Sequence, residues 1–86
     1  MRFNMFQDAY CHTSNEVIDV MRDKNIEPTE CHADFSFDEE TDGWIGEVRE
    51  NEDGKTVCYL EGFTSAQEIR VTLLDTGIAV GDISEL

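Results

Sequence analysis

The stretch that decides the fold is Cys31-His32-Ala33-Asp34-Phe35-Ser36-Phe37-Asp38, in which apolar and polar side chains alternate without a break. Successive side chains of a β-strand point to opposite faces of a sheet. The odd-numbered residues of this stretch would therefore share a buried face, and the even-numbered residues would face solvent. The pattern predicts a strand with one face in the core.

Two further strand-like runs follow, at residues 44–50 and 56–63. The acidic segment 38–43 is the expected first turn, and segment 51–55 is the second, where Gly54 accepts a positive φ angle. Short turns between consecutive strands produce antiparallel neighbours. We therefore expect a three-stranded antiparallel meander.

A helix is predicted on the N-terminal side of this meander. Thr13 and Glu16 match the capping box, in which the hydroxyl accepts a bond from a free amide and the carboxylate reaches back to the cap amide. Apolar residues then recur at near-helical spacing until Pro28, the only proline, which disfavours helical geometry in the residue before it. The helix is expected at residues 14–25.

A second capping box, Ser65 to Glu68, begins the segment after the meander. Apolar residues of this segment share one helical face, and Gly77 is a suitable C-terminal cap. The stretch 69–74 also alternates and contains β-branched residues, so a strand competes with the helix. The favoured interpretation is a helix at residues 65–76.

The two ends of the chain carry weaker signals. Residues 2–7 predict a strand, residues 8–12 a connection, and residues 78–80 a short edge strand. No repeat or low-complexity tract divides the chain, so we expect one domain over residues 1–86. The element order predicts an α+β fold in which two helices cover one face of an antiparallel sheet, with the terminal strands as candidate extensions.

Charge restricts the classes of partner. Twenty Asp and Glu residues against six Lys and Arg residues give a net charge of -14 and a pI near 4.1. Such a surface repels phosphate backbones and anionic lipids, so direct binding to nucleic acid or to a membrane is not expected. The 40% content of apolar residues still suffices for a small core, which favours a folded chain.

The compartment is indicated by two features. The N-terminal residues contain no apolar run typical of a secretory signal, and no stretch is long enough to span a membrane. The three cysteines form an odd set that cannot pair completely within one chain. Both features favour a reducing cytoplasm and free thiols.

Two dipeptides, Cys11-His12 and Cys31-His32, contain the ligand types of a zinc site. Zinc motifs space paired ligands by about two to four residues, whereas adjacent residues of a strand point to opposite faces. Buried thiols and solvated imidazoles are the favoured interpretation, and no metal or other cofactor is expected. Segment 38–43 resembles the start of a calcium loop, but Arg49 stands where a bidentate glutamate is required.

Enzymatic activity is not expected either. Cys58 has no basic neighbour in the sequence that would lower its pKa, and its alternation with Leu60 indicates an inward thiol. The glycines match no phosphate-binding spacing. A chain of 86 residues also has little room for a deep pocket that excludes water.

Acidic side chains concentrate in the predicted meander and its turns. They are Asp34, Asp38, Glu39, Glu40, Asp42, Glu47, Glu50, Glu52, Asp53 and Glu61. Carboxylates on the open face of a sheet lie at separations comparable with the spacing of phosphates along a nucleic-acid strand, about 7 Å. These acids are candidate partner-binding residues. A solvated face that keeps the chain soluble and a halophilic adaptation are the competing interpretations.

Aromatic residues are the other candidates, because protein interfaces usually depend on a few buried Trp, Tyr or Arg side chains. Trp44 and Tyr59 lie on neighbouring predicted strands and are candidates for a cross-strand pair. We expect Trp44 in the core. Tyr59 is placed among the candidate partner-binding residues.

In its small size, extreme negative charge and lack of catalytic motifs, the chain resembles small phage-encoded anti-defence proteins. These include anti-CRISPR proteins and DNA mimics such as the uracil-DNA glycosylase inhibitor. The resemblance implies an inhibitor that acts in the cytoplasm of a host cell. The candidate edge strand at residues 78–80 leaves open both a monomer and a homodimer that pairs these edges. The implied partner of the inhibitor is a host nucleic-acid-binding protein or a CRISPR effector complex, whose nucleic-acid channel the inhibitor blocks. No motif is shared, so no functional residue is carried over.

Two other classes of function remain open at this stage. The first is an antitoxin-like or regulatory module that neutralises one basic protein. The second is a small metalloprotein or enzyme built on the two Cys-His dipeptides. The order of helix, three strands and helix also resembles the double-stranded RNA-binding domain, but the basic residues that such a domain needs are missing.

Overall fold

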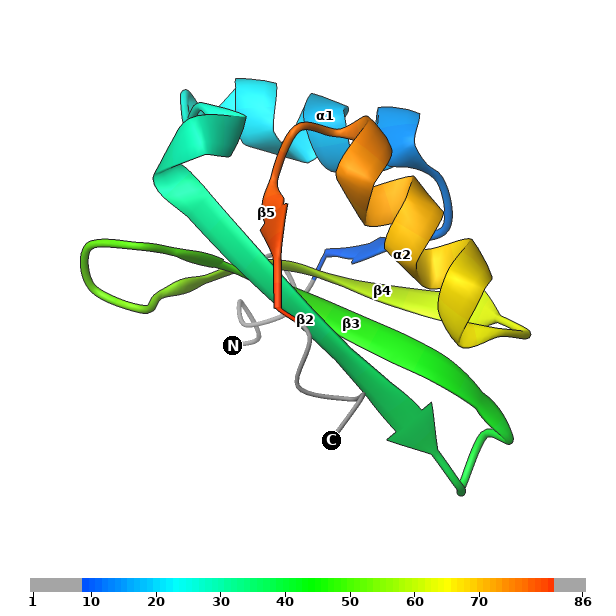
Figure 1. Cartoon of the computed structure of the whole chain (residues 1–86). Coiled ribbons are helices and arrows are strands. Elements are labelled where there is room, and N and C mark those ends of the chain that lie inside the picture. The colour runs from blue at the N-terminus through cyan, green and yellow to red at the C-terminus, as the bar shows by residue number, and fades with distance from the viewer. Residues whose placement is uncertain (1–8, 82–86) are drawn as a thin grey trace, which may run out of the picture.

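The computed structural model describes residues 9–81. Its elements are β1 (Tyr10–Cys11), α1 (Ser14–Lys24), the short 3-10 helix η2 (Pro28–Glu30), β2 (Cys31–Asp38), β3 (Gly43–Glu50), β4 (Thr56–Phe63), α2 (Ala66–Asp75) and β5 (Ala79–Val80). The strands of this region form one five-stranded sheet in the order β1-β4-β3-β2-β5, and α1 and α2 lie on one face of it (Figure 1). The predicted α+β class with two helices is confirmed.

The sheet is mixed, whereas the sequence predicted antiparallel pairing. β2 pairs with β3, and β3 with β4, in antiparallel orientation, but β1 pairs with β4 and β5 with β2 in parallel orientation. The chain passes from β1 to β2 through α1, and from β4 to β5 through α2. A connection through a helix returns the chain in the same direction, so β1 runs parallel to β2, and β5 runs parallel to β4. Because β2 and β4 are both antiparallel to β3, they share one direction, and each outer strand is parallel to its neighbour.

The first helix begins where the capping box predicted it. The Thr13 hydroxyl accepts a hydrogen bond from the amide of Glu16 at 3.2 Å. The Glu16 carboxylate differs from the expectation, because it accepts from the amide of His12 at 2.6 Å and not from the cap residue itself. The helix ends at Asn25, which adopts the left-handed conformation with φ 61°. Pro28 therefore does not end α1; it begins η2.

The second helix also begins at its predicted hydroxyl cap, and its carboxylate again bonds the amide of the residue before the cap; the helix is confirmed and the competing strand is excluded. Ser65 accepts from the amide of Glu68 at 3.1 Å, and the Glu68 carboxylate accepts from the amide of Thr64 at 3.0 Å. Ile69 and Leu73 are fully buried on the face that α2 turns toward the sheet. Helical spacing therefore decides this segment, because it buries both side chains at once.

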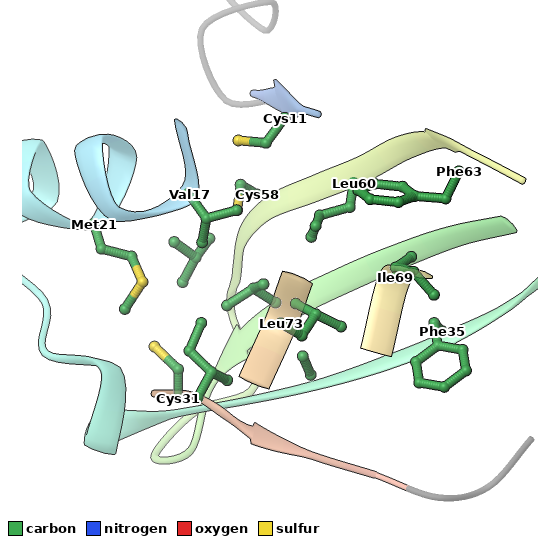
Figure 2. Packing of buried hydrophobic residues seen from close by; sticks show 14 residues of the cluster. Cys11, Val17, Met21, Cys31, Phe35, Cys58, Leu60, Phe63, Ile69 and Leu73 are labelled. Atoms are coloured by element: carbon green, nitrogen blue, oxygen red, sulfur yellow. The ribbon is translucent and has the colours of Figure 1, made fainter. Parts of the chain in front are cut away.

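The core lies between the sheet and the two helices, as Figure 2 shows. Leu60 of β4 and Val48 of β3 are completely buried, and Cys58 points into the same layer, as its alternation predicted. Gly46 allows α2 to approach β3 closely, because a Cβ atom there would lie 3.1 Å from Ile69 Cδ1 and 3.3 Å from the Asp34 carbonyl oxygen. No side chain larger than hydrogen fits at Gly46 without displacing its neighbours.

Two local predictions were wrong. The segment predicted as a connection contains strand β1, because Tyr10 and Cys11 pair with Tyr59 and Leu60 of β4. Phe37 was predicted to be buried but is 47% exposed, and its ring forms a T-shaped pair with Trp44 at 5.7 Å between centroids. The predicted strand at residues 2–7 lies outside the described residues. Within those residues, no helix is long and apolar enough to cross a membrane.

Candidate partner-binding site

The face of the sheet opposite the helices is the candidate site, and we call it the open face. Along β2 and β3 its side chains alternate with those of the buried core, as the register of the two strands shows. The open face is formed by Tyr10, His32, Asp34, Ser36, Ile45, Glu47, Arg49, Thr56 and Tyr59. No other described element of residues 9–81 lies over this face (Figure 1).

The centre of the open face is a network of two carboxylates and one guanidinium. Asp34 and Glu47 lie directly opposite each other on β2 and β3. Arg49 donates to Glu47 at 2.8 Å and lies 3.9 Å from Asp34. Thr56 donates to the second oxygen of Glu47 at 2.5 Å. Like charges on facing residues repel, and Arg49 offsets that repulsion.

The network changes the acidity of Glu47. Its hydrogen bond from Arg49 lowers the pKa of the Glu47 carboxyl from the ordinary value of 4.5, and the bond from Thr56 acts in the same direction. The carboxylate therefore keeps its negative charge throughout the neutral and mildly acidic range.

A pH-dependent contribution to stability follows from this lowered pKa. In a group whose folded pKa is depressed, the stabilisation is complete above the unfolded pKa and is lost as pH falls through the folded pKa. Glu47→Gln should therefore reduce the free energy of unfolding by about 1 kcal/mol at pH 7 and by less at pH 3, as urea unfolding would measure. Glu52→Gln, in the exposed turn, is the control. An equal loss for Glu47→Gln at both pH values would contradict the assignment.

An aromatic pair borders the network on the β4 side. The rings of Tyr10 and Tyr59 stack with centroids 5.3 Å apart and planes at 22°. Tyr10 is 54% exposed, and Ile45 on the same face is 37% exposed. Trp44 belongs to the opposite face, where it packs partly buried against Phe35, so the predicted pair of Trp44 with Tyr59 does not form. Tyr59 pairs with Tyr10 instead, because β1 lies beside β4.

The predicted acids fall into separate groups. Glu39, Glu40 and Asp42 lie in the turn between β2 and β3, where Thr41 also donates to Asp38 at 2.8 Å. Glu50, Glu52 and Asp53 lie at the turn between β3 and β4. Strands of eight residues separate these turns by about 25 Å. The acids therefore form a central pair, Asp34 and Glu47, and two acidic turns at opposite ends of the sheet.

Glu61 belongs to none of these groups. Its carboxylate lies 3.4 Å from Nε2 of His12, and Nδ1 of the same ring lies 3.8 Å from Glu16. His12 thus joins the end of β4 to the start of α1. The sequence offered no signal for this contact, because it depends on the pairing of β1 with β4.

Sequence reasoning also omitted Arg49 and Tyr10 from the site. Arg49 alternates with Glu47 along β3, and this spacing was a usable signal that both share the open face. Tyr10 carried no such signal, because its strand contains two residues and is recognisable only from its partner.

The three cysteine thiols differ in acidity: the hydrogen bond with Cys58 lowers the pKa of the Cys11 thiol. All three thiols are buried and free, and the side chains of Cys11 and Cys58 are hydrogen-bonded to each other. The contact with Cys11, together with burial, holds the pKa of Cys58 far above its ordinary value. Burial likewise raises the pKa of Cys31. Within residues 9–81, no three His, Cys, Asp or Glu side chains are grouped closely enough to hold a metal ion.

Comparison of the chain with protein-family models, characterised proteins and solved structures finds no match. The function is therefore inferred from the chemistry of the open face and its two acidic turns.

Proposed function

We propose that this protein is an inhibitor that binds a nucleic-acid-processing complex of host defence, such as a CRISPR effector, and blocks the basic cleft where nucleic acid binds. The observation that carries the proposal is the layout of the open face. A stacked tyrosine pair, with Tyr10 exposed and Tyr59 half-buried, occupies a sheet surface that has an acidic turn at each end. Interfaces commonly combine aromatic residues at the centre with charged residues at the rim.

The charge of the whole chain supports the same proposal. A net charge of -14 on 86 residues produces a field that attracts a basic surface and accelerates its encounter. The acidic turns direct this attraction to the two ends of the open face. The tyrosine pair then contributes contact area that charge alone does not supply.

Affinity capture tests the proposal. The tagged protein is incubated with a lysate of bacterial cells that carry CRISPR and restriction systems, and the bound proteins are eluted at increasing salt and identified by mass spectrometry. We expect one nucleic-acid-binding protein or complex, released by salt because screening weakens attraction between exposed charges. Tyr10→Ala with Tyr59→Ala should reduce the recovery, whereas Val71→Ala, an exposed change on α2, should not. Recovery of a small partner without nucleic-acid affinity would favour a toxin-neutralising module.

A further inference from the structure

The centre of the open face is hollowed beside the aromatic pair. A depression of about 100 Å³ lies there, and its wall includes Asp34, Ser36, Ile45, Glu47 and Tyr59. The wall therefore combines two carboxylates, a hydroxyl, an aliphatic side chain and an aromatic ring. This combination suits a ligand group that carries positive charge and also has an apolar flat surface.

The two carboxylates of the depression differ in their free acceptor capacity. Both oxygens of Glu47 accept bonds, one from Arg49 at 2.8 Å and one from Thr56 at 2.5 Å. The shortest distance between Asp34 and Arg49 is 3.9 Å, which exceeds hydrogen-bond length. Asp34 thus retains the capacity to accept a bond from an incoming donor. The formal charges of Asp34, Glu47 and Arg49 sum to -1, so a cation is still attracted to the centre.

We propose that this depression binds an arginine side chain of the partner protein. A guanidinium group is planar, donates two parallel bonds to one carboxylate and stacks on aromatic rings. Asp34 is the acceptor in this arrangement, and Tyr59, held in place by its stack on Tyr10, is the stacking surface. A lysine ammonium carries the required positive charge but has no planar surface to stack on Tyr59. An anionic group would be repelled by the carboxylates of Asp34 and Glu47.

A second copy of this chain is a poor occupant of the open face, because two chains of charge -14 repel each other. A basic protein with an arginine in its nucleic-acid cleft has the complementary charge. The inference rests on the proposed function for the source of the arginine, but the chemistry of the depression is measurable without the partner.

The test is a titration of the ¹⁵N-labelled protein with three blocked tripeptides, acetyl-Gly-Xaa-Gly-amide, in which Xaa is arginine, lysine or the neutral isostere citrulline. The arginine peptide should shift the amide signals of residues 34–36, 45–47 and 59, with a Kd on the order of millimolar. The lysine peptide should bind several times more weakly, and the citrulline peptide should leave the signals in place. Equal shifts from the arginine and lysine peptides would overturn the inference.

Two matched variants distinguish binding in the depression from attraction by the overall negative charge of the protein. Asp34→Asn and Glu52→Gln each remove one negative charge, the first inside the depression and the second in the exposed turn. Asp34→Asn should weaken the arginine peptide about fivefold, and Glu52→Gln should change its affinity little. Tyr59→Leu should reduce the difference between arginine and lysine. Equal effects of Asp34→Asn and Glu52→Gln would show that only the field acts.

The peptide titration and the affinity capture can fail independently, so the arginine site and the proposed function are tested separately. Binding of the arginine peptide together with capture of no nucleic-acid-binding protein would refute the proposed function and leave the depression as an arginine site. Capture of such a protein with unchanged affinity by Asp34→Asn would retain the function and refute the arginine site.

Discussion

Replacing Gly46 by valine should destabilise the fold, because the site between β3 and α2 is already filled. A Cβ atom at this position lies 3.1 Å from Ile69 Cδ1 and 3.3 Å from the Asp34 carbonyl oxygen, and valine adds two further carbons. Overpacking of a filled core typically costs about 1–3 kcal/mol. A domain of this size has little stability in reserve, so part of the variant population should be unfolded at room temperature.

Urea unfolding measures the effect, and two controls define it. Ala79→Val adds two carbons at an exposed position of β5 and should change the free energy of unfolding by less than about 0.5 kcal/mol. Ile69→Ala removes the side chain that the introduced valine would meet, so the two core changes should cost less together than the sum of their separate costs. Strict additivity of these costs, or a fully stable Gly46→Val variant, would contradict the close packing of α2 on β3.

Reversing the charge of the acidic turns should slow association with the captured partner about tenfold at low salt. Glu39→Lys with Glu52→Lys places one reversal in each turn and changes the net charge from -14 to -10, since each replacement adds two. Both side chains are exposed, so the fold should be unaffected. The loss should shrink at high salt, because the screening length falls to about 3 Å at 1 M.

The control variant has the same net charge, but its two charge reversals lie on α1 instead of in the acidic turns. Asp19→Lys with Asp23→Lys also gives -10, but both residues lie on the exposed side of α1, opposite the buried Val17 and Met21. Stopped-flow association rates of the two double variants should differ by several-fold, with the turn variant slower. Equal rates would show that the total charge matters and that the turns have no special position.

The sequence predicted the elements that local rules determine. Both helices begin at hydroxyl caps, because Thr13 and Ser65 satisfy amides that the helix leaves free. The strand at 31–38 follows from strict alternation, since only a period of two separates its buried side chains from its polar ones. These features depend on neighbours within about four residues, and one sequence is enough to recognise them.

The features that the sequence did not predict depend on distant contacts. β1 contains two residues and therefore has no period, so it was predicted as a connection. β5 lies within the edge strand predicted at residues 78–80, but the parallel pairing of both strands is set by the crossovers through α1 and α2. The candidate site shows the same division. Asp34 and Glu47 are on the open face as alternation indicated, whereas the stack of Tyr10 on Tyr59 requires the position of β1.

The central claim is that this protein and nucleic acid compete for one basic cleft of the partner. The most direct measurement is fluorescence anisotropy of a labelled nucleic acid bound to the captured partner, during titration with this protein. We predict that the anisotropy falls to the value of the free nucleic acid, and that the concentration needed rises in proportion to added unlabelled nucleic acid. A ternary complex, seen as an anisotropy that stays constant or increases while this protein binds, would contradict the account.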